Sequence, residues 1–367
     1  MPRLDKQNVS WAVLVSLVIC FPFISCFGQN TPPVKVSLRD IGGPQFPTGF
    51  WLSKSDPHFR HHLDNLFWLS SDKVAMTFFK EYCCRTGGKS GVKFVSAVFD
   101  TSGNNISNHE WISMPDDPFK VGGVARFFLA QYRDRVVFVR GDFTVAGQIP
   151  IPKGSRLIWS KRSDSVAVQD GRSLLLYETE GLTQAESIDL PPDTRPVDLY
   201  GHAALVNSST PKVCYVGILQ PGVARSWALS TAAQQVSGKC ASGVGLISAD
   251  AVLITQPKRN GAPSPGVSST VKIVHFDGSE ETIPTLGRPI GIADSGRIAF
   301  QVFYPSSLAR TLDMDFGGHK EFAIYDPSTK ATVFRKKFGG QAGAALAADG
   351  RHVAVIDGNN LLIYALP

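Results

Sequence analysis

The chain has 367 residues, of which 43% are hydrophobic and 19% are charged, so it can build a sizeable core and is neither a disordered nor a fibrous protein. Its 34 glycines and 24 prolines indicate many turns. The formal net charge of +6 is carried by scattered cations such as Lys161-Arg162 and the triplet Arg335-Lys336-Lys337. Nucleic-acid binding would need a concentrated basic face, so we interpret these cations as solvated side chains at strand edges and expect no nucleic-acid partner.

Residues 1–28 are typical of a secretory signal peptide. Arg3 and Lys6 precede the apolar run WAVLVSLVICFPFIS, which is short and interrupted by proline for a transmembrane span. Cleavage after Gly28 would leave residues 29–367 as one exported domain, periplasmic or extracellular. The stretch FISC also resembles a bacterial lipobox, in which Cys26 would be lipidated and would tether the protein to a membrane. An uncut signal anchor is the third alternative.

Four cysteines lie outside the signal, namely Cys83, Cys84, Cys214 and Cys240. An even number in an oxidising compartment favours disulfides. We expect Cys214 to pair with Cys240, because the two are close enough in sequence to join neighbouring strands of one sheet. The adjacent Cys83 and Cys84 could form a vicinal disulfide, bridge elsewhere or stay reduced. No two of these cysteines have the spacing of structural zinc ligands.

One ordered unit recurs along the chain. In each copy a turn containing Asp or Gly precedes a short apolar strand, and a second strand ending near an aromatic residue follows after a gap. One residue from the expected second strand of each copy marks the repeat: Ala75, Val137, Ala167, Ala204, Leu253, Ala299 and Ala354. These residues span 279 positions over six intervals. The period of about 46 residues is that of a four-stranded propeller blade.

The sequence therefore predicts an all-β fold, a β-propeller with seven four-stranded blades. A sandwich or two small barrels would explain alternating apolar residues and frequent turns equally well, and six or eight blades are the neighbouring alternatives. The recurrence of one ordered unit favours the propeller. Asp-Gly suits the positive φ of a two-residue hairpin turn, and the small alanine that follows lets adjacent blades approach closely.

The stretches SGRIAF (Ser295 to Phe300) and DGRHVAV (Asp349 to Val355) resemble the Pro-Asp-Gly-x-x-Ile-Ala motif of WD40-like propellers of the TolB and PD40 type. The likeness covers the first half of several blades. Asp294 and Ala348 stand where this motif has proline, and no copy carries the Gly-His and Trp-Asp pairs of true WD40 repeats. The resemblance implies the fold of the superfamily and no specific family, so it implies no ligand.

The C-terminal stretches AALAA, HVAVID and LLIYAL provide three strands for a four-stranded blade. A closed propeller commonly takes the missing strand from its other terminus, which removes an open sheet edge. VKVSL, Val34 to Leu38, is the first strand-like run after the signal. We predict that it pairs with Leu361 to Leu366 and closes the ring.

Three motifs suggest chemistry, each with a plainer interpretation. CCRTGGKS, residues 83–90, resembles the end of a phosphate-binding loop but precedes a strand, so an exposed hairpin loop fits better. DPHFRHHLD, residues 56–64, lacks a metal-ligand spacing and is better interpreted as a polar segment before the first blade. LDMDFGGHKEF lies in an insertion of the sixth blade that begins near Tyr304. Its Asp313, Asp315 and His319 are weak candidates for a cation or substrate site.

Two functional hypotheses remain. The first is an exported, non-catalytic binding or scaffold propeller that presents its loops or channel to a protein, a peptide or a glycan, and we favour it because no catalytic motif is evident. The second is an enzyme with a metal-assisted hydrolase or lyase site at the channel mouth, which would need acidic, His or Asn residues from several blades to converge. No motif indicates a bound cofactor.

Overall fold

The structure is a computed structural model, and it describes residues 32–38, 66–81, 92–111, 120–124, 126–160, 162, 164–208, 215–222, 242–257, 269–275, 277–284, 286–304, 318–340 and 342–367. The chain divides into two units, Met1–Thr31 and Pro32–Pro367, and every described residue belongs to the second. The described part contains 27 β-strands and no α-helix. Accordingly, it offers no helix with the length and hydrophobicity needed to cross a membrane.

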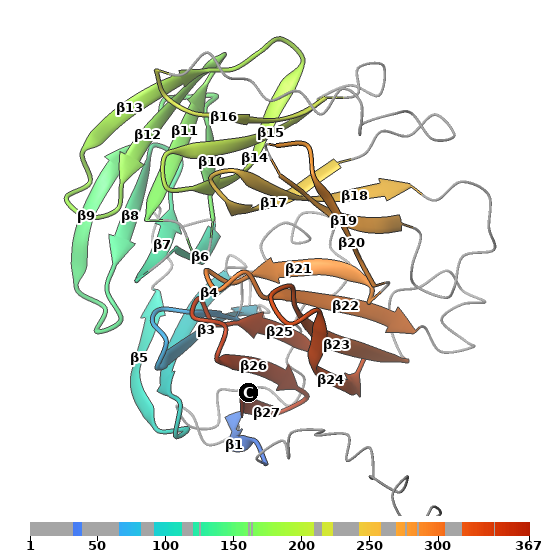
Figure 1. Ribbon diagram of the computed structural model, residues 1–367. Helices are drawn as coiled ribbons and strands as arrows, with labels where there is room; N and C mark the ends of the chain where they lie inside the picture. Colours follow the sequence, from blue (N-terminus) through green and yellow to red (C-terminus); the bar gives the residue numbers. More distant parts are fainter. Residues whose placement is uncertain are drawn as a thin grey trace, which may run out of the picture. The chain divides into compact units, whose positions relative to one another are not determined.

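The strands form seven antiparallel sheets, which succeed one another along the chain as the blades of a propeller (Figure 1). Blade 1 contains β2 (Leu66–Trp68), β3 (Lys73–Glu81), β4 (Val92–Asp100) and β5 (Asn105–Trp111). Blade 2 contains β6 (Lys120–Val124), β7 (Phe127–Gln131), β8 (Arg135–Val139) and β9 (Val145–Pro150). Blade 3 contains β10 (Arg156–Trp159), β11 (Ser165–Asp170), β12 (Ser173–Glu178) and β13 (Gln184–Asp189).

Blade 4 has three described strands, and the remaining blades have four. Blade 4 contains β14 (Thr194–Tyr200), β15 (Ala203–Ser208) and β16 (Val216–Leu219). Blade 5 contains β17 (Ser242–Ser248), β18 (Ala251–Pro257), β19 (Ser269–His275) and β20 (Glu280–Ile283). Blade 6 contains β21 (Arg288–Ile292), β22 (Ile298–Tyr304), β23 (His319–Asp326) and β24 (Ala331–Gly339). Blade 7 contains β25 (Gly343–Leu346), β26 (His352–Asp357), β27 (Asn360–Ala365) and β1 (Val34–Ser37).

The N-terminal strand completes the last blade, as predicted. β1 runs antiparallel to β27, with Val34 opposite Ile363 and Val36 opposite Leu361. The Leu38 amide extends the ladder by donating to the Asn359 carbonyl at 2.8 Å. β1 is the outermost strand of blade 7 and lies beside β27 in Figure 1. The prediction of seven blades closed by residues 34 to 38 is confirmed.

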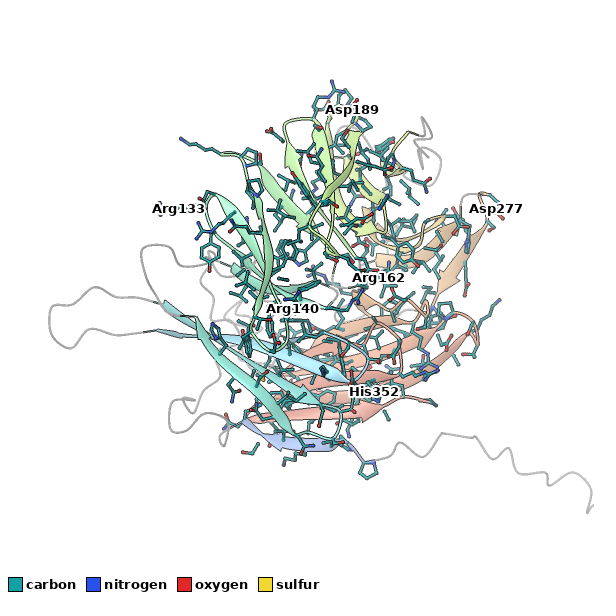
Figure 2. All side chains as sticks on the ribbon, turned by 90° about the vertical axis from the view of Figure 1, so that its left-hand side faces the viewer. Arg133, Arg140, Arg162, Asp189, Asp277 and His352 are labelled. Atoms are coloured by element: carbon teal, nitrogen blue, oxygen red, sulfur yellow. The ribbon has the colours of Figure 1, made fainter. Side chains whose placement is uncertain are left out.

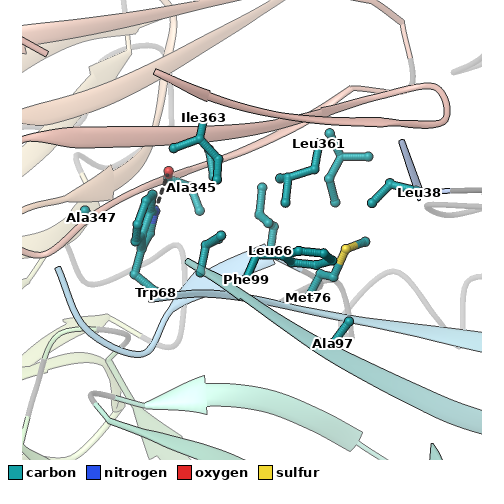
Figure 3. Packing of buried hydrophobic residues seen from close by; sticks show 13 residues of the cluster. Leu38, Leu66, Trp68, Met76, Ala97, Phe99, Ala345, Ala347, Leu361 and Ile363 are labelled. Carbon is teal, nitrogen blue, oxygen red and sulfur yellow. Dashed lines mark hydrogen bonds between the residues drawn. The ribbon is translucent and has the colours of Figure 1, made fainter. Parts of the chain in front are cut away.

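The hydrophobic core is divided among the seams between blades. The described buried apolar residues form seven clusters, and each cluster joins two successive blades. The cluster between blades 7 and 1 includes Leu361 and Leu38 on one side and Phe99 on the other (Figure 3). In the same seam, the Trp68 indole N–H donates to the Ala345 carbonyl at 3.0 Å. The first and last blades therefore pack like any other neighbouring pair.

The second strand of each blade is apolar on both sides because it packs against two neighbouring blades. In β11, Val166 and Val168 pack toward blade 2, whereas Ala167 packs toward blade 4. Ala75, Ala299 and Ala354 likewise face the following blade. The small side chain leaves room for a neighbour's larger one, which explains the Val-Ala-Val pattern.

Two of the residues that marked the repeat sit differently from the others. Ala204 lies on the second strand of its blade but faces the preceding blade. Val137 is a correction, because it lies on β8, the third strand of blade 2, where it pairs with Ala130 of β7. The turn Tyr132 to Asp134 resembles a turn between first and second strands in sequence, since both kinds are followed by apolar strands.

Candidate functional site

The innermost strands of the blades surround a cavity of about 760 Å³, which we call the channel. Described residues from six blades line it, whereas none of the described residues of blade 2 does. Each blade begins at its innermost strand, so one end of the channel carries the beginnings of these strands and the other carries their ends. The channel has three levels with different chemistry.

The first level, the mouth, is cationic. It comprises Arg156 and Arg288, the first residues of β10 and β21, together with Gln301 and Lys320. Blades 3 and 6 are separated by two blades in one direction and three in the other, so the two arginines lie across the channel from each other. The Lys320 ammonium donates to the Ala342 carbonyl at 2.8 Å. Among the described residues, neither arginine has an ion-pair partner, and the mouth contributes no carboxylate to the channel lining.

The second level, the belt, is aliphatic and results from irregular strand pairing. In three successive blades the innermost strand has a bulge at the level of the belt, between Pro196 and Asp198, between Gly243 and Gly245, and between Pro289 and Gly291, and β17 has a second one between Leu246 and Ser248. A bulge inserts one extra residue and redirects side chains. The extra residues are Val197, Val244 and Ile290, and all three line the channel. Val244 is 36% exposed although it is a large apolar residue.

The third level, the base, centres on Arg162 in the turn between β10 and β11. Its side chain is only 5% exposed and lies toward the middle of the ring, whereas Asp189 and Asp277 lie at its outer edges (Figure 2). One guanidinium nitrogen, Nη1, donates to the Ile247 carbonyl at 3.4 Å and to the Ala293 carbonyl at 3.3 Å. The guanidinium also lies 4.9 Å from the centre of the Tyr200 ring. One side chain of blade 3 therefore contacts blades 4, 5 and 6.

The other terminal nitrogen of Arg162 has no such partner. Nη2 is buried and makes no hydrogen bond within the described structure. Its nearest acidic atom is Oδ2 of Asp198, at 4.0 Å, which is beyond hydrogen-bond distance. Because Arg162 and Asp198 both line the channel, this unsatisfied donor lies in the wall of the cavity.

Asp198 owes its position to the bulge in β14. Its side chain is 13% exposed, and its Oδ2 accepts a hydrogen bond from the Leu246 amide at 2.8 Å. Burial raises the pKa of this carboxyl, and the neighbouring Arg162 opposes the rise. Loss of surrounding water also raises the pKa of Asp294, with Arg162 opposing and Asp164 reinforcing the shift. The base thus holds one buried cation among carboxyls that are easier to protonate than usual.

Arg162 corrects one interpretation made from the sequence. The sequence predicts a solvated Lys161-Arg162 pair, whereas Arg162 is among the least exposed charged side chains of the channel. A signal is present in the repeat. When the copies are aligned on Ala167, Ala299 and Ala354, Arg162 occupies the position of Asp294 and Asp349. This reversal of charge in a turn marks the third copy as different.

The predicted candidates lie mostly outside the described residues, including Asp313, Asp315, Cys214 and Cys240. His319 is described and begins β23, where its ring stacks on Tyr304 with the centroids 4.6 Å apart. His319 is not among the residues that line the channel. Within the described segments, no three His, Cys, Asp or Glu side chains are grouped as metal ligands would be.

Comparisons with known proteins agree on the fold. No protein-family model matches the sequence, and no curated protein matches it. Among solved structures, the acylaminoacyl peptidase of Pyrococcus horikoshii is similar with a TM-score of 0.50 and 11% identity, over 83% of this chain and 51% of the peptidase. The Pan2 WD40 domain of Neurospora crassa is similar with a TM-score of 0.47 and 10% identity, over 92% of this chain and 95% of that domain.

The β-propeller domain of the Trilobed protease from Pyrococcus furiosus has a TM-score of 0.47 and 11% identity, over 80% of this chain and 90% of that one. At these identities the likeness concerns the fold alone, and this chain spans about half of the peptidase. The chain folds as a seven-bladed β-propeller, and the comparisons show no specific family.

Proposed function

We propose that the protein is a non-catalytic binding propeller whose channel takes an acidic peptide segment of a partner protein. The observation that carries the proposal is the pair Arg156 and Arg288, which face each other across the mouth without acidic partners in the described structure. Carboxylates are the natural partners of guanidinium groups, which can bind them through two parallel hydrogen bonds. Two unpaired arginines at one opening therefore favour an anionic ligand.

The belt favours a peptide over a glycan. Val197, Val244 and Ile290 offer aliphatic surface immediately inside the cationic mouth. An apolar side chain gains free energy when it leaves water for such a surface, at roughly 25 cal/mol per Å² buried. A peptide can present carboxylates and an apolar side chain within a few residues, which matches the order of the two levels.

Selection from a random 12-residue peptide library displayed on phage tests the proposal and assumes no particular ligand. We expect the peptides that bind residues 29–367 to be enriched in Asp and Glu next to a large apolar or aromatic residue. Synthetic copies of these peptides should bind more weakly as salt increases, because exposed charges are screened. The variant Arg156→Glu/Arg288→Glu should reduce their affinity at least tenfold.

The matched control is Arg133→Glu, which makes the same charge change at an exposed turn on the outside of blade 2 (Figure 2). It should leave the affinity within twofold of the unaltered protein. The proposal is wrong if the selected peptides show no acidic preference, or if the double variant binds them as well as Arg133→Glu does. Binding of an acidic oligosaccharide such as trigalacturonate, in the absence of any selected acidic peptide, would identify a glycan-binding propeller instead.

We also propose that the protein is exported. The support is the sequence of residues 1–28, with Arg3 and Lys6 before an apolar run of signal length. The intact mass of the protein recovered from outside the cytoplasm distinguishes cleavage after Gly28 from lipidation of Cys26. In the same sample, peptide mapping without reduction should find Cys214 joined to Cys240, and free thiols at both positions would contradict the pairing.

A further inference from the structure

We propose that the base of the channel is a binding site for the hydroxyl of a tyrosine side chain, carried by the acidic segment that enters through the mouth. The inference rests on the proposed function and adds the identity of the residue that enters. It comes from a second, separate feature, the unsatisfied donor Nη2 of Arg162 at the base.

The unsatisfied donor requires an oxygen. The Arg162 side chain is only 5% exposed, and a buried charged N–H without a partner is costly. The Asp198 Oδ2 atom is 4.0 Å from Nη2, so the two do not satisfy each other. A single oxygen placed about 2.8 Å from both atoms fits this separation, accepting a hydrogen bond from Nη2 and donating one to the carboxylate.

A hydroxyl meets that requirement better than a carboxylate does. A hydroxyl is both donor and acceptor, whereas an ionised carboxylate only accepts. Asp198 and Asp294 already surround the Arg162 cation, so a further negative charge at the base would be repelled. Carboxylates of the ligand are instead expected at Arg156 and Arg288, where the described lining contains cations and no carboxylate.

The belt between the two polar levels selects among hydroxyl-bearing side chains. Arg288 and Ile290 are two residues apart on β21, about 7 Å along a strand, and the base lies beyond them. Serine and threonine would place a hydroxyl close to the peptide backbone and leave the belt without an apolar partner. Tyrosine has an apolar ring with a hydroxyl at its far end. In this proposal the ring packs against Val197, Val244 and Ile290, and the hydroxyl reaches the base.

Replacement of tyrosine by phenylalanine in the peptides tests the inference directly. The two side chains differ by one oxygen, and a site built to bind a hydroxyl rejects the analogue that lacks it. Each acidic peptide selected by the unaltered protein is synthesised with its aromatic residue as Tyr and as Phe, and affinities are measured by calorimetry. We expect Tyr to dominate the selected sequences and the Phe versions to bind at least tenfold more weakly.

The variant Asp198→Asn assigns this discrimination to the base. The Asp198 oxygen that accepts from the Leu246 amide becomes a neutral amide oxygen, so the bond that the ligand hydroxyl donates to it loses the strengthening effect of the negative charge. Discrimination between Tyr and Phe should fall below threefold. The matched control Asp277→Asn, at an exposed turn of blade 5, should keep the full ratio (Figure 2).

The outcomes separate the two proposals. Acidic peptides that bind equally well with Tyr or Phe would overturn the tyrosine site and leave the acidic-peptide function standing. A Tyr preference that Asp198→Asn does not change would place the hydroxyl elsewhere and would also overturn the inference. If Asp198→Asn does not fold, the ratio measured with the unaltered protein decides. Absence of any acidic preference would refute both proposals.

Discussion

The guanidinium of Arg162 donates to the carbonyl oxygen of Ala293 at 3.3 Å, and the two residues are 131 positions apart in the chain. The bond crosses the channel from blade 3 to blade 6. The same guanidinium nitrogen donates to Ile247 of blade 5, and Asp198 of blade 4 lies 4.0 Å from the other terminal nitrogen. In the sequence repeat, the turn that contains Arg162 is one of seven equivalent turns. In the structure, this turn connects four blades at the base of the channel.

Arg162→Ala should therefore destabilise the ring. The substitution removes the bonds to blades 5 and 6 and leaves Asp198 as a buried carboxylate without a cation. Removing one partner of a buried pair typically costs about 3–5 kcal/mol of unfolding free energy. Equilibrium unfolding in urea measures the loss. The control Arg133→Ala, at an exposed turn, should change the unfolding free energy by less than about 0.5 kcal/mol. An equally small effect of Arg162→Ala would show that the buried cation does not stabilise the fold.

The raised pKa of Asp198 predicts how stability depends on pH. Burial raises the pKa in the folded protein above the ordinary value of 3.8, and Arg162 only partly opposes this. Between the two values the unfolded chain releases a proton that the folded protein retains, so this group's contribution to stability falls as pH rises. The contribution is fully present below a pH of 3.8 and is lost as pH passes the raised pKa.

Asp198→Asn isolates this effect, since it removes the titration and keeps an acceptor for the Leu246 amide. The difference in unfolding free energy, unaltered protein minus variant, should decrease from about pH 4 upward. Urea unfolding at a series of pH values gives that difference. Burial raises the pKa of Asp326, but hydrogen bonds with Ser328 and Arg297 outweigh it and lower the pKa. Because Asp326 titrates in the unaltered protein and in the variant alike, its contribution cancels in the difference. A difference that rises with pH would contradict the expectation.

The fold was largely predictable because it repeats. The Val-Ala-Val strands exist in several copies, each dictated by the same contacts with two neighbouring blades, so the period emerges from a single sequence. The closing strand was predictable for a related reason. Three strands at the C-terminus leave an edge, and residues 34 to 38 have the apolar alternation to cover it.

The channel was not predictable in the same way, because its residues break the repeat. Val197, Val244 and Ile290 line it only because the innermost strands bulge, and a bulge changes the face of a residue without any change in composition. Arg162 and Asp198 meet across blades, so their relation depends on the closed ring. The loop candidates Asp313 and Asp315 stand out through composition alone, and they lie outside the described residues.

The closing strand should contribute strongly to stability through one side chain. Leu38 is 1% exposed and packs in the seam between blades 7 and 1, whereas Lys35 of β1 points to solvent. Leu38→Ala should lower the unfolding free energy by about 2–5 kcal/mol, because it leaves a cavity in the core. Lys35→Ala should have little effect. Thermal unfolding of both variants provides the comparison, and equal melting temperatures would mean that β1 does not close the ring in solution.

Blades 1 and 2 approach each other closely at Gly123 of β6. A Cβ atom built there would lie 1.9 Å from Cδ2 of Phe67, a ring that is 1% exposed and packs edge-on against Phe128 at 5.3 Å. The ring has no space to retreat into, so Gly123→Ala must displace the seam. Overpacking of this kind costs about 1–3 kcal/mol, and occasionally more.

Gly343 of β25 is the matched control for Gly123, because it also lies on an innermost strand and an added Cβ would meet nothing within 4 Å. Gly343→Ala should be neutral or slightly stabilising, since alanine reduces the freedom of the unfolded chain. Urea midpoints for the two variants test the contrast. Equal stability of Gly123→Ala and Gly343→Ala would mean that Phe67 lies farther from the β6 backbone than in the structure. Close packing at Gly123 would then not contribute to the stability of the seam between blades 1 and 2.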